Sequence, residues 1–302
     1  MKGKVLITGG TGFIGYHLSK EFLKRNYKVT SISLTKPKKK RYLRNMNYLY
    51  CDLGNYNALK KTIVGDFDYV INLAGHVDHT NKAKVINSHF NGCKNLSTIF
   101  LKRKIKGFFQ IGSCVEYGYK ASPQKENAKI KLNTIRSNYG ISKYLATKYL
   151  LNLHQKKKFP VIILRLYLIY GPRQDTNRLI PIVLQKCKRR QGFPCSEGSQ
   201  MRDFLHINDL VNLFFKIIQT SRKNYFGNIY NVGFGKPYSV KNVIMLIKKI
   251  VKGGKPNFGK IKLRKDEITE LYPDINKIKD YFKWKPKIGL KKGISLLVNY
   301  DK

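Results

Sequence analysis

The sequence predicts an α/β fold built on a doubly wound parallel sheet, with a smaller α/β domain after it. Short apolar runs alternate with amphipathic stretches through the first half of the 302 residues, and this alternation is typical of parallel strands joined by helices. Hydrophobic residues make up 42% of the chain, which indicates a folded core. No apolar run approaches the length of about 20 residues that a membrane-spanning helix needs.

The first predicted strand leads into a glycine turn. Val5–Ile7 is a short apolar run, GGTGFIG follows it, and an amphipathic segment then begins at Phe13. The spacing G-x-G-x-x-G permits a tight turn, a close backbone approach to a pyrophosphate and close packing of helix on strand. We therefore expect a Rossmann-type dinucleotide-binding domain. The turn residues expected to contact the cofactor are Gly9, Thr11, Gly12, Phe13, Ile14 and Gly15.

The elements that follow continue the alternation. Further strands are expected at Lys28–Ser33, Tyr48–Cys51, Tyr69–Leu73, Gly107–Ile111 and Val161–Leu166. Helices are expected at Asn55–Val64, Val85–Arg103 and Tyr139–Leu153. Ligands of such sheets bind at the carboxyl ends of the strands. Other cofactor contacts are therefore expected just after strands three and four, from Leu53, Leu73, Ala74 and Gly75.

After Tyr170–Pro172 the alternation loosens, which predicts a second domain. We expect a dinucleotide-binding domain over residues 1–175, rejoined by parts of 205–235, and a discontinuous substrate-binding domain over 176–302. The expected helices of this part are Leu179–Arg190, Asn208–Thr220, Ser239–Val251 and Ile275–Phe282, with a strand at Asn228–Val232 and a loop or short strand at Gln191–Gln200.

The formal net charge of +43 is the unusual feature of the composition. A field of this size attracts nucleic acid, anionic membranes or phosphorylated ligands. The cations are spread over many segments, however, so a general compositional bias is the simpler explanation. Weak association with an anionic membrane is the next alternative, and we expect no specific nucleic-acid partner.

The five cysteines are scattered and show no C-x-x-C pairing. This argues against a disulfide framework and against a zinc site, so no bound metal is expected. The N-terminus leads directly into the first strand and does not look like a secretory signal. The expected location is the reducing cytoplasm.

The end of the second strand indicates which dinucleotide binds. An NAD site usually has an acidic residue there, which holds the ribose 2′-OH. Ser33 occupies this place, and no Asp or Glu occurs between Glu21 and Asp52. Lys36 and further cations follow, and they suit a 2′-phosphate. NADP(H) is therefore favoured, with NAD(H) as the alternative if the lysines belong to the general bias. Asp52 is expected either to bind the adenine amino group or to cap a turn.

A second pattern suggests acid–base chemistry. Tyr139 and Lys143 form Y-x-x-x-K, which places both side chains on one face of a helix. A neighbouring ammonium favours the phenolate of a tyrosine, whose ordinary pKa of about 10 is too high for neutral pH. Ser113 follows the fifth strand, where its hydroxyl would orient a substrate oxygen. The plainer readings are a surface helix and a serine turn.

These features together resemble the extended short-chain dehydrogenase/reductase family, which holds nucleotide-sugar epimerases, dehydratases and reductases. The resemblance runs nearly end to end, through TGGTGFIG, NLAG, GSCVEYG, YGISK, LRLYLIYGP, RLIP and GSQMRDFLHINDL. It implies that Ser113, Tyr139 and Lys143 are the catalytic triad. It also implies that Arg202 contacts the substrate diphosphate and Arg264 the nucleotide, unless either arginine forms only a salt bridge. Asn177, just before RLIP, is a further substrate candidate, and a homodimer is implied by the resemblance alone.

The sequence also departs from the family pattern. Dehydratases carry Asp-Glu directly after the Ser/Thr, whereas Cys114 and Val115 stand here, which disfavours dehydration. Strand alternation predicts that Glu116 points away from its neighbours' side. The usual Asn of the fourth helix is His89, and a usual sugar contact is replaced by Leu168. Two loop histidines near the end of strand four are weaker sugar-contact candidates, His76 and His79.

The resemblance implies hydride transfer to or from C4 of a nucleotide-activated hexose. Use of NADP(H) favours net reduction of a 4-keto sugar, and the C-terminal signatures are most similar to 4-keto-6-deoxyhexose reductases of the CDP-paratose and abequose type, which serve surface-polysaccharide synthesis. The alternative within this class is a C4 epimerase that keeps its cofactor bound. An alternative of another class is a non-catalytic nucleotide- or RNA-binding protein.

Overall fold

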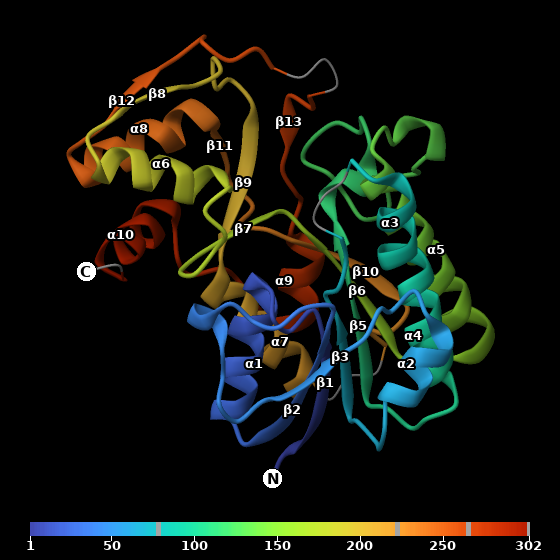
Figure 1. The fold of residues 1–302 in the computed structure, drawn as a ribbon. Helices are drawn as coiled ribbons and strands as arrows, with labels where there is room; N and C mark the ends of the chain where they lie inside the picture. Colours follow the sequence, from blue (N-terminus) through green and yellow to red (C-terminus); the bar gives the residue numbers. More distant parts are fainter. Residues whose placement is uncertain (77–79, 221–223, 264–266, 301–302) are drawn as a thin grey trace. The chain divides into compact units, whose positions relative to one another are not determined.

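The computed structural model describes residues 1–76, 80–220, 224–263 and 267–300 (Figure 1). The chain divides into two compact units. Unit 1 comprises Met1–Gly118, Lys129–Arg165 and Thr220–Tyr230, and unit 2 comprises Tyr119–Ala128, Leu166–Gln219 and Asn231–Lys302. Within the described ranges, no helix has both the length and the apolarity needed to cross a membrane.

Seven strands form the central sheet. They are β1 (Gly3–Thr8), β2 (Tyr27–Ser33), β3 (Asn47–Tyr50), β4 (Tyr69–Asn72), β5 (Gly107–Ser113), β6 (Val161–Leu166) and β10 (Asn228–Val232). Their order is β10-β6-β5-β4-β1-β2-β3, and β1 pairs in parallel with both β2 and β4. The chain therefore builds one half of the sheet outward from β1 and then crosses to build the other half. The predicted doubly wound parallel sheet is confirmed.

The strands of this sheet are apolar on both faces. Val5, Leu6 and Ile7 of β1 have 0% exposure, as expected where helices cover both sides of a parallel sheet. Buried polar side chains lie from the middle to the carboxyl ends of these strands. The Thr8 hydroxyl donates to Asn72 Oδ1 at 2.6 Å, and Asn72 Nδ2 donates to Gln110 Oε1 at 2.7 Å. This chain of hydrogen bonds ties together the ends of β1, β4 and β5, where the predicted site lies.

Helices cover the two faces of the sheet in unit 1. These helices are α1 (Phe13–Lys24), α2 (Tyr56–Thr62), α3 (Lys82–Ile86), α4 (Gly92–Leu101) and α5 (Asn138–Lys157). Short turns of other helix types lie at η1 (Lys39–Arg41), η2 (Asn87–Asn91), η3 (Cys114–Tyr117) and η4 (Leu132–Thr134). In Figure 1, α2, α4 and α5 lie side by side on one face, and α1 lies on the other. Aliphatic and aromatic residues of the first face and the strands form one core.

The predicted helix Val85–Arg103 differs from the observed one in an informative way. It consists of α3, the π-helical turn η2 and α4, which run on without a break. A π turn holds one more residue than an α turn and widens the helix locally, often at a functional site. Here it carries His89, which is buried. Hydrophobic periodicity alone did not reveal this insertion.

Unit 2 is built from short strands and amphipathic helices. Its helices are α6 (Leu179–Lys188), α7 (Ile207–Gln219), α8 (Val240–Val251), α9 (Asn276–Phe282) and α10 (Leu290–Tyr300). Its strands are β7 (Leu168–Tyr170), β8 (Gly192–Pro194), β9 (Met201–His206), β11 (Pro237–Ser239), β12 (Lys255–Asn257) and β13 (Glu270–Leu271). β9 pairs with β7, β11 and β13, and β8 pairs with β12. Side chains of α6, α8 and α10 form the core of this unit.

Candidate active site

The glycine turn links the carboxyl end of β1 to the start of α1. Gly9 N–H donates to Ile32 O at 2.7 Å, and Gly12 N–H donates to Gly9 O at 3.0 Å. Gly9 has a φ of 70°, which favours glycine. A Cβ on Gly15 would lie 2.3 Å from the carbonyl oxygen of Gly9, so only glycine allows α1 to approach the turn this closely.

This turn fits a dinucleotide phosphate group. Gly12 occupies the N-cap position of α1 and has no side chain with which to cap it, and the first turn of α1 contains no acidic residue. The backbone N–H groups and the positive end of the helix dipole therefore face the place where a pyrophosphate binds in this kind of turn. Phe13 and Ile14 contribute the first of those N–H groups, whereas the amide of Thr11, before the helix, donates to Ser33 Oγ.

The end of β2 has the predicted polar, non-acidic character. Ser33 is buried, and its Oγ lies 3.2 Å from Ser31 Oγ and 3.5 Å from the Thr11 amide that donates to it. Lys36 is exposed. Asp52 is exposed as well, and its Oδ1 accepts the Gly54 amide at 2.8 Å, so it caps the turn before α2.

The end of β4 meets the end of β1. Leu73 N–H donates to Thr8 O at 3.2 Å, and Ala74 N–H donates to Thr8 Oγ1 at 3.2 Å. Gly75 follows, and a Cβ there would lie only 1.7 Å from the ring of His89. Leu53, after β3, is buried in the core of unit 1. The residues expected to surround a cofactor therefore gather on neighbouring strand ends.

Lys143 lies at the carboxyl end of β5. Its Nζ donates to Ile111 O at 2.7 Å, two residues before Ser113, which ends the strand. The Lys143 side chain is buried, and this burial lowers its pKa to about 8, although the negative charge of Glu116 opposes the shift. Lys143 therefore carries its proton at neutral pH and loses it slightly above.

Tyr139 lies one turn before Lys143 on α5. Its ring centroid is 5.9 Å from Lys143 Nζ, and its side chain is half-buried. Ser137 begins the helix by accepting the Gly140 amide at 3.0 Å on its side-chain oxygen. A Cβ on Gly140 would lie 3.1 Å from Val115 O, so glycine lets α5 lie directly against η3, the turn after Ser113. The fold thus brings the predicted Ser, Tyr and Lys together at one strand end.

His89 is a neighbour of Tyr139 that the sequence pattern did not assign. The two rings meet edge to face with centroids 5.0 Å apart. His89 Nε2 lies 3.2 Å from the carbonyl oxygen of His76, whose own amide donates to Ser88 Oγ at 2.9 Å. The π turn brings the imidazole to this place. Of the two loop histidines considered for a sugar contact, His79 lies outside the described residues.

Glu116 does not follow strand alternation, and the expectation that it points away is wrong. The strand ends at Ser113, and η3 turns Glu116 back into the interior with 0% exposure. Its Oε1 accepts the Ser113 amide at 2.8 Å. Its Oε2 accepts Thr147 Oγ1 at 2.8 Å and Arg165 Nε at 3.0 Å. The signal that would have revealed this is the S-x-x-E spacing, which is typical of a capping box.

Two further predicted substrate residues, Asn177 and Arg202, belong to unit 2. The guanidinium of Arg202 is ion-paired with Glu267, and its Nη1 donates to Met201 O at 2.8 Å and Thr269 O at 3.2 Å. The carboxylate of Asp203 accepts hydrogen bonds from the backbone amides of residues 234–236. Burial raises the pKa of Asp203 to about 6, and these three hydrogen bonds oppose the rise. Asn177 is exposed before α6, and Arg264 lies outside the described residues.

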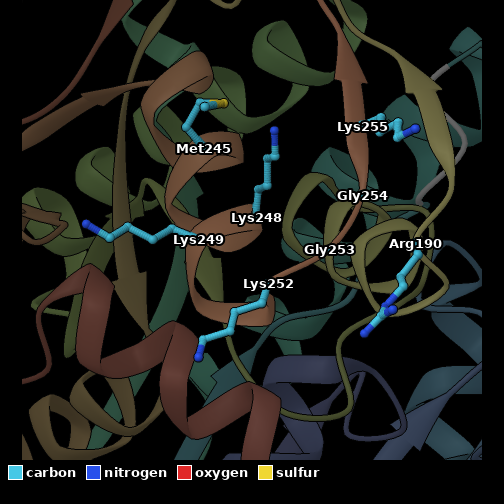
Figure 2. A pocket seen from close by; sticks show the side chains of 8 residues that line it. All are labelled: Arg190, Met245, Lys248, Lys249, Lys252, Gly253, Gly254 and Lys255. Carbon is cyan, nitrogen blue, oxygen red and sulfur yellow. The ribbon is translucent and has the colours of Figure 1, made fainter.

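Figure 2 shows a hollow of about 600 Å³ in unit 2. Its lining is mostly cationic and consists of Arg190, Met245, Lys248, Lys249, Lys252, Gly253, Gly254 and Lys255. The ammonium groups of α8 point in different directions, and they stand at the negative end of that helix dipole. Among the described residues of this lining there is none of the predicted site residues, so the hollow is not part of the candidate active site.

The profile of the NAD dependent epimerase/dehydratase family matches residues 5–233. The chain belongs to this family. The family resemblance seen in the sequence is thereby confirmed, and this protein is an enzyme of the NAD-dependent epimerase/dehydratase family.

Curated relatives of this family are similar over nearly the whole chain. A putative UDP-glucose 4-epimerase of Methanocaldococcus jannaschii is 29% identical over 309 residues, covering 99% of this chain and 98% of the relative. A CDP-abequose synthase of Salmonella typhimurium is 26% identical over 308 residues, covering 99% and 98%.

Solved structures of the epimerase/dehydratase family share the fold. UDP-glucose 4-epimerase of Thermotoga maritima, solved with UDP-glucose, has a TM-score of 0.86 at 23% identity and covers 99% of this chain and 98% of its own. UDP-glucuronic acid 4-epimerase of Bacillus cereus, solved with UDP-glucuronic acid and NAD, has a TM-score of 0.86 at 24% identity and covers 98% of both chains.

Proposed function

We propose that this enzyme catalyses hydride transfer between a nicotinamide and C4 of a nucleotide-activated hexose, with Tyr139 as the acid–base group. The observation that carries the proposal is the buried Lys143 ammonium, held by Ile111 O one helical turn from Tyr139 and beside the strand end that bears Ser113. An ammonium in this place stabilises a phenolate, which is what a tyrosine needs in order to exchange protons near neutral pH.

A nicotinamide dinucleotide held by the glycine turn would supply or accept the hydride. During reduction of a 4-keto sugar, the Tyr139 hydroxyl gives its proton to the carbonyl oxygen, and the O–H bond of Tyr139 breaks as the sugar O–H bond forms. The resulting phenolate is stabilised by Lys143 until a proton from solvent restores it. Ser113 donates a hydrogen bond that orients the same oxygen. During oxidation of a C4 hydroxyl the proton moves the opposite way.

Two features of the turn region support NADP(H) as the cofactor. Ser33 replaces the carboxylate that would repel a 2′-phosphate, and its hydroxyl is held beside the Thr11 amide. The exposed Lys36 and the cations after it are a source of positive charge for that phosphate. NAD(H) is the alternative, and solved relatives of the family are in complex with NAD.

We propose that Arg202 binds the diphosphate of the nucleotide sugar, with Arg264 and Asn177 as further contacts. The ion pair with Glu267 and the bonds to two carbonyl oxygens fix the plane of the Arg202 guanidinium. A fixed guanidinium is suited to phosphate oxygens, because little side-chain freedom is lost on binding. The names of the relatives include UDP- and CDP-sugar enzymes, which supports this substrate class.

Dehydration does not fit the site. Cys114 and Val115 occupy the places after Ser113 where acidic side chains would eliminate water. Glu116 is the next residue, but its two oxygens accept three hydrogen bonds in the interior. No carboxylate of the described GSCVEYG segment is therefore free to act on C5 and C6.

Two outcomes of C4 chemistry remain, and each has its own support. Net reduction of a nucleotide-4-keto-6-deoxyhexose for surface-polysaccharide synthesis is favoured by the NADP-type features at Ser33, since a released cofactor can be recharged. C4 epimerisation is favoured by the names of several relatives. An epimerase would oxidise C4, turn the keto sugar over and return the hydride to its other face.

One assay separates these outcomes. Purified protein is mixed with UDP-, dTDP-, CDP- and GDP-4-keto-6-deoxyhexoses and NADPH, and cofactor absorbance is followed. Consumption of NADPH with one of these sugars supports the reductase. Equilibration of a nucleotide 4-hydroxy sugar with its C4 epimer, without net cofactor change, supports the epimerase. Absence of turnover on both panels together with salt-sensitive RNA binding would support the non-catalytic alternative.

The remaining proposals concern the cellular location, the oligomeric state and the membrane association of the protein. We propose a cytoplasmic homodimer that associates at most weakly with anionic membranes. The proposed dimer surface consists of the segments Val85–Arg103 and Tyr139–Leu153, which lie in α3, η2 and α4 and in α5. Light scattering after size-exclusion chromatography measures the oligomeric state, and a monomeric mass would contradict the dimer.

A further inference from the structure

Glu116 joins three segments of unit 1 with one carboxylate. Ser113 ends β5, Thr147 lies on α5, and Arg165 lies in β6. These hydrogen bonds measure 2.8, 2.8 and 3.0 Å. Arg165 is 1% exposed and Thr147 is also 1% exposed, so water does not compete for these donors.

The surroundings of Glu116 are shaped around this arrangement. A Cβ on Gly112 would lie 2.5 Å from Glu116 Oε1 and 3.1 Å from Arg165 Cγ, so the glycine before Ser113 makes room for the ion pair. The guanidinium of Arg165 also packs over the ring of Tyr117 with its Cζ 4.5 Å from the centroid. Because both charges are buried and matched, neither partner can move without leaving the other uncompensated.

Two of the hydrogen bonds that Glu116 accepts connect it to the segments that carry the proposed reacting groups. The amide it accepts belongs to Ser113 itself. Thr147 lies one turn after Lys143 and two turns after Tyr139, on the same face of α5. The carboxylate therefore fixes the turn that bears the serine against the helix that bears the tyrosine and the lysine.

We propose that Glu116 is a positioning residue that holds Ser113 in register with Tyr139 and Lys143. This inference rests on the proposed function, because it concerns the same three groups. Glu116 does not touch the substrate in this role. It sets the separation and the orientation of groups that do, and errors of about 1 Å in such a separation lower rates by about a hundredfold.

The charge of Glu116 has a second effect on the same site. Lys143 is faced by Glu116 from η3, by Cys93 from α4, by Tyr139 on its own helix and, through that ring, by His89 from η2. Burial raises the pKa of Cys93 to about 12, so its thiol is neutral at physiological pH. Glu116 is thus the anionic neighbour that favours a protonated Lys143.

A threonine variant tests the tether without removing the charge. Thr147→Val has nearly the same shape but lacks the hydroxyl that donates to Glu116. We expect kcat to fall about tenfold with KM changed less than about twofold, since binding groups stay in place while the reacting groups lose register. Thr147→Ser keeps the hydroxyl and should restore kcat. An unchanged kcat in Thr147→Val would overturn the proposal.

A spectroscopic measurement does not depend on turnover. With carbon-13 at Cζ of tyrosine, the Tyr139 resonance is assigned by its loss in Tyr139→Phe, and its pH titration follows phenol ionisation. Lys143 Nζ is anchored on Ile111 O of β5, whereas the Tyr139 ring stands on α5. In Thr147→Val the contact between η3 and α5 loosens, so the ammonium shifts relative to the ring and the Tyr139 titration midpoint should rise by about half a pH unit. If the wild type shows no turnover, the proposed function fails, yet this midpoint still decides the positioning role. An unchanged midpoint in Thr147→Val contradicts that role.

A matched control separates positioning from stability. Asp68 accepts Lys4 N–H at 2.7 Å and pairs with Lys106 at 2.8 Å, at the opposite end of the sheet. Asp68→Asn should lower the melting temperature without changing kcat or the Tyr139 midpoint. Glu116→Gln should lower both kcat and melting temperature. If Glu116→Gln folds and retains the wild-type kcat, Glu116 has only a structural role.

Discussion

The Nζ of Lys143 lies 5.9 Å from the centroid of the Tyr139 ring. The amine reaches this position because its side chain is buried and donates to the carbonyl oxygen of Ile111 at 2.7 Å. A charged amine without solvent around it is costly to bury, and its field is strong on neighbouring groups. The predictions that follow test the consequences of this arrangement and of the glycine turn.

Tyr139→Phe removes the proton donor and leaves the ring that packs on His89. We expect turnover to fall at least a thousandfold, since general acid–base catalysis contributes about 10² to 10⁴ in rate and no described group replaces the phenol. Cofactor binding, measured by NADPH fluorescence, should persist. Undiminished turnover would show that another group moves the proton.

Lys143→Met tests the cost of burying the ammonium through the pH dependence of stability. The pKa of Lys143 is lowered to about 8 in the folded protein, so between about 8 and its ordinary value of 10.5 the unfolded chain binds more protons. The free energy of unfolding should therefore rise with pH in this window, by about 3 kcal/mol in total at about 1.4 kcal/mol per pH unit. Below pH 8 the burial penalty is present in full.

The comparison for this experiment is the same titration in Lys143→Met. Both proteins are unfolded with urea between pH 7.5 and 10, and the difference between their unfolding free energies isolates the lysine from the many exposed lysines. A difference that stays constant with pH would mean that Lys143 titrates at its ordinary value.

Gly15→Ala tests the close approach of α1 to the glycine turn. The added Cβ would lie 2.3 Å from Gly9 O and 2.6 Å from Gly10 Cα, which are backbone atoms and cannot move aside independently. We expect the turn to shift and the affinity for NADPH to fall more than tenfold, or about 1.4 kcal/mol. Gly192→Ala is the control, because its Cβ would have its nearest neighbour at 3.8 Å. Equal cofactor affinity in both variants would contradict the assigned role of the turn.

Ser33→Asp tests the choice of cofactor. The new carboxylate at the end of β2 would repel a 2′-phosphate and accept a hydrogen bond from a free 2′-OH. We expect the ratio of kcat/KM for NADPH to that for NADH to fall at least tenfold. Ser33→Asn supplies a similar shape without the charge and should change this ratio less. If the ratio does not move in Ser33→Asp, the 2′-phosphate does not bind at this strand end.

Much of unit 1 was predictable because its signals are local. The run Val5–Ile7 is apolar throughout, which is typical of a central strand buried on both faces. The spacing of the glycines after it is typical of a dinucleotide-binding turn. Helix geometry places Tyr139 and Lys143 on one face of α5. These features depend on neighbours within one or two turns, so the sequence pattern contains them.

The features that were missed depend on contacts between distant segments. Arg202 pairs with Glu267, and the strand that carries Arg202 is held by β7, β11 and β13 from three other places in the chain. Pairing of this kind leaves no periodic signal in any one segment. The orientation of Glu116 was wrongly predicted for a different reason. Strand alternation was extended to Glu116, although the strand ends at Ser113 and Glu116 lies in the helical turn η3.

The η3 turn also determines which positions of this site can be rebuilt. Glu116 is committed to the interior and cannot be replaced without leaving the guanidinium of Arg165 uncompensated. Cys114 and Val115 stand where dehydratases carry acidic groups. A redesign toward water elimination would therefore recode these two positions and keep the glutamate that follows them as part of the scaffold.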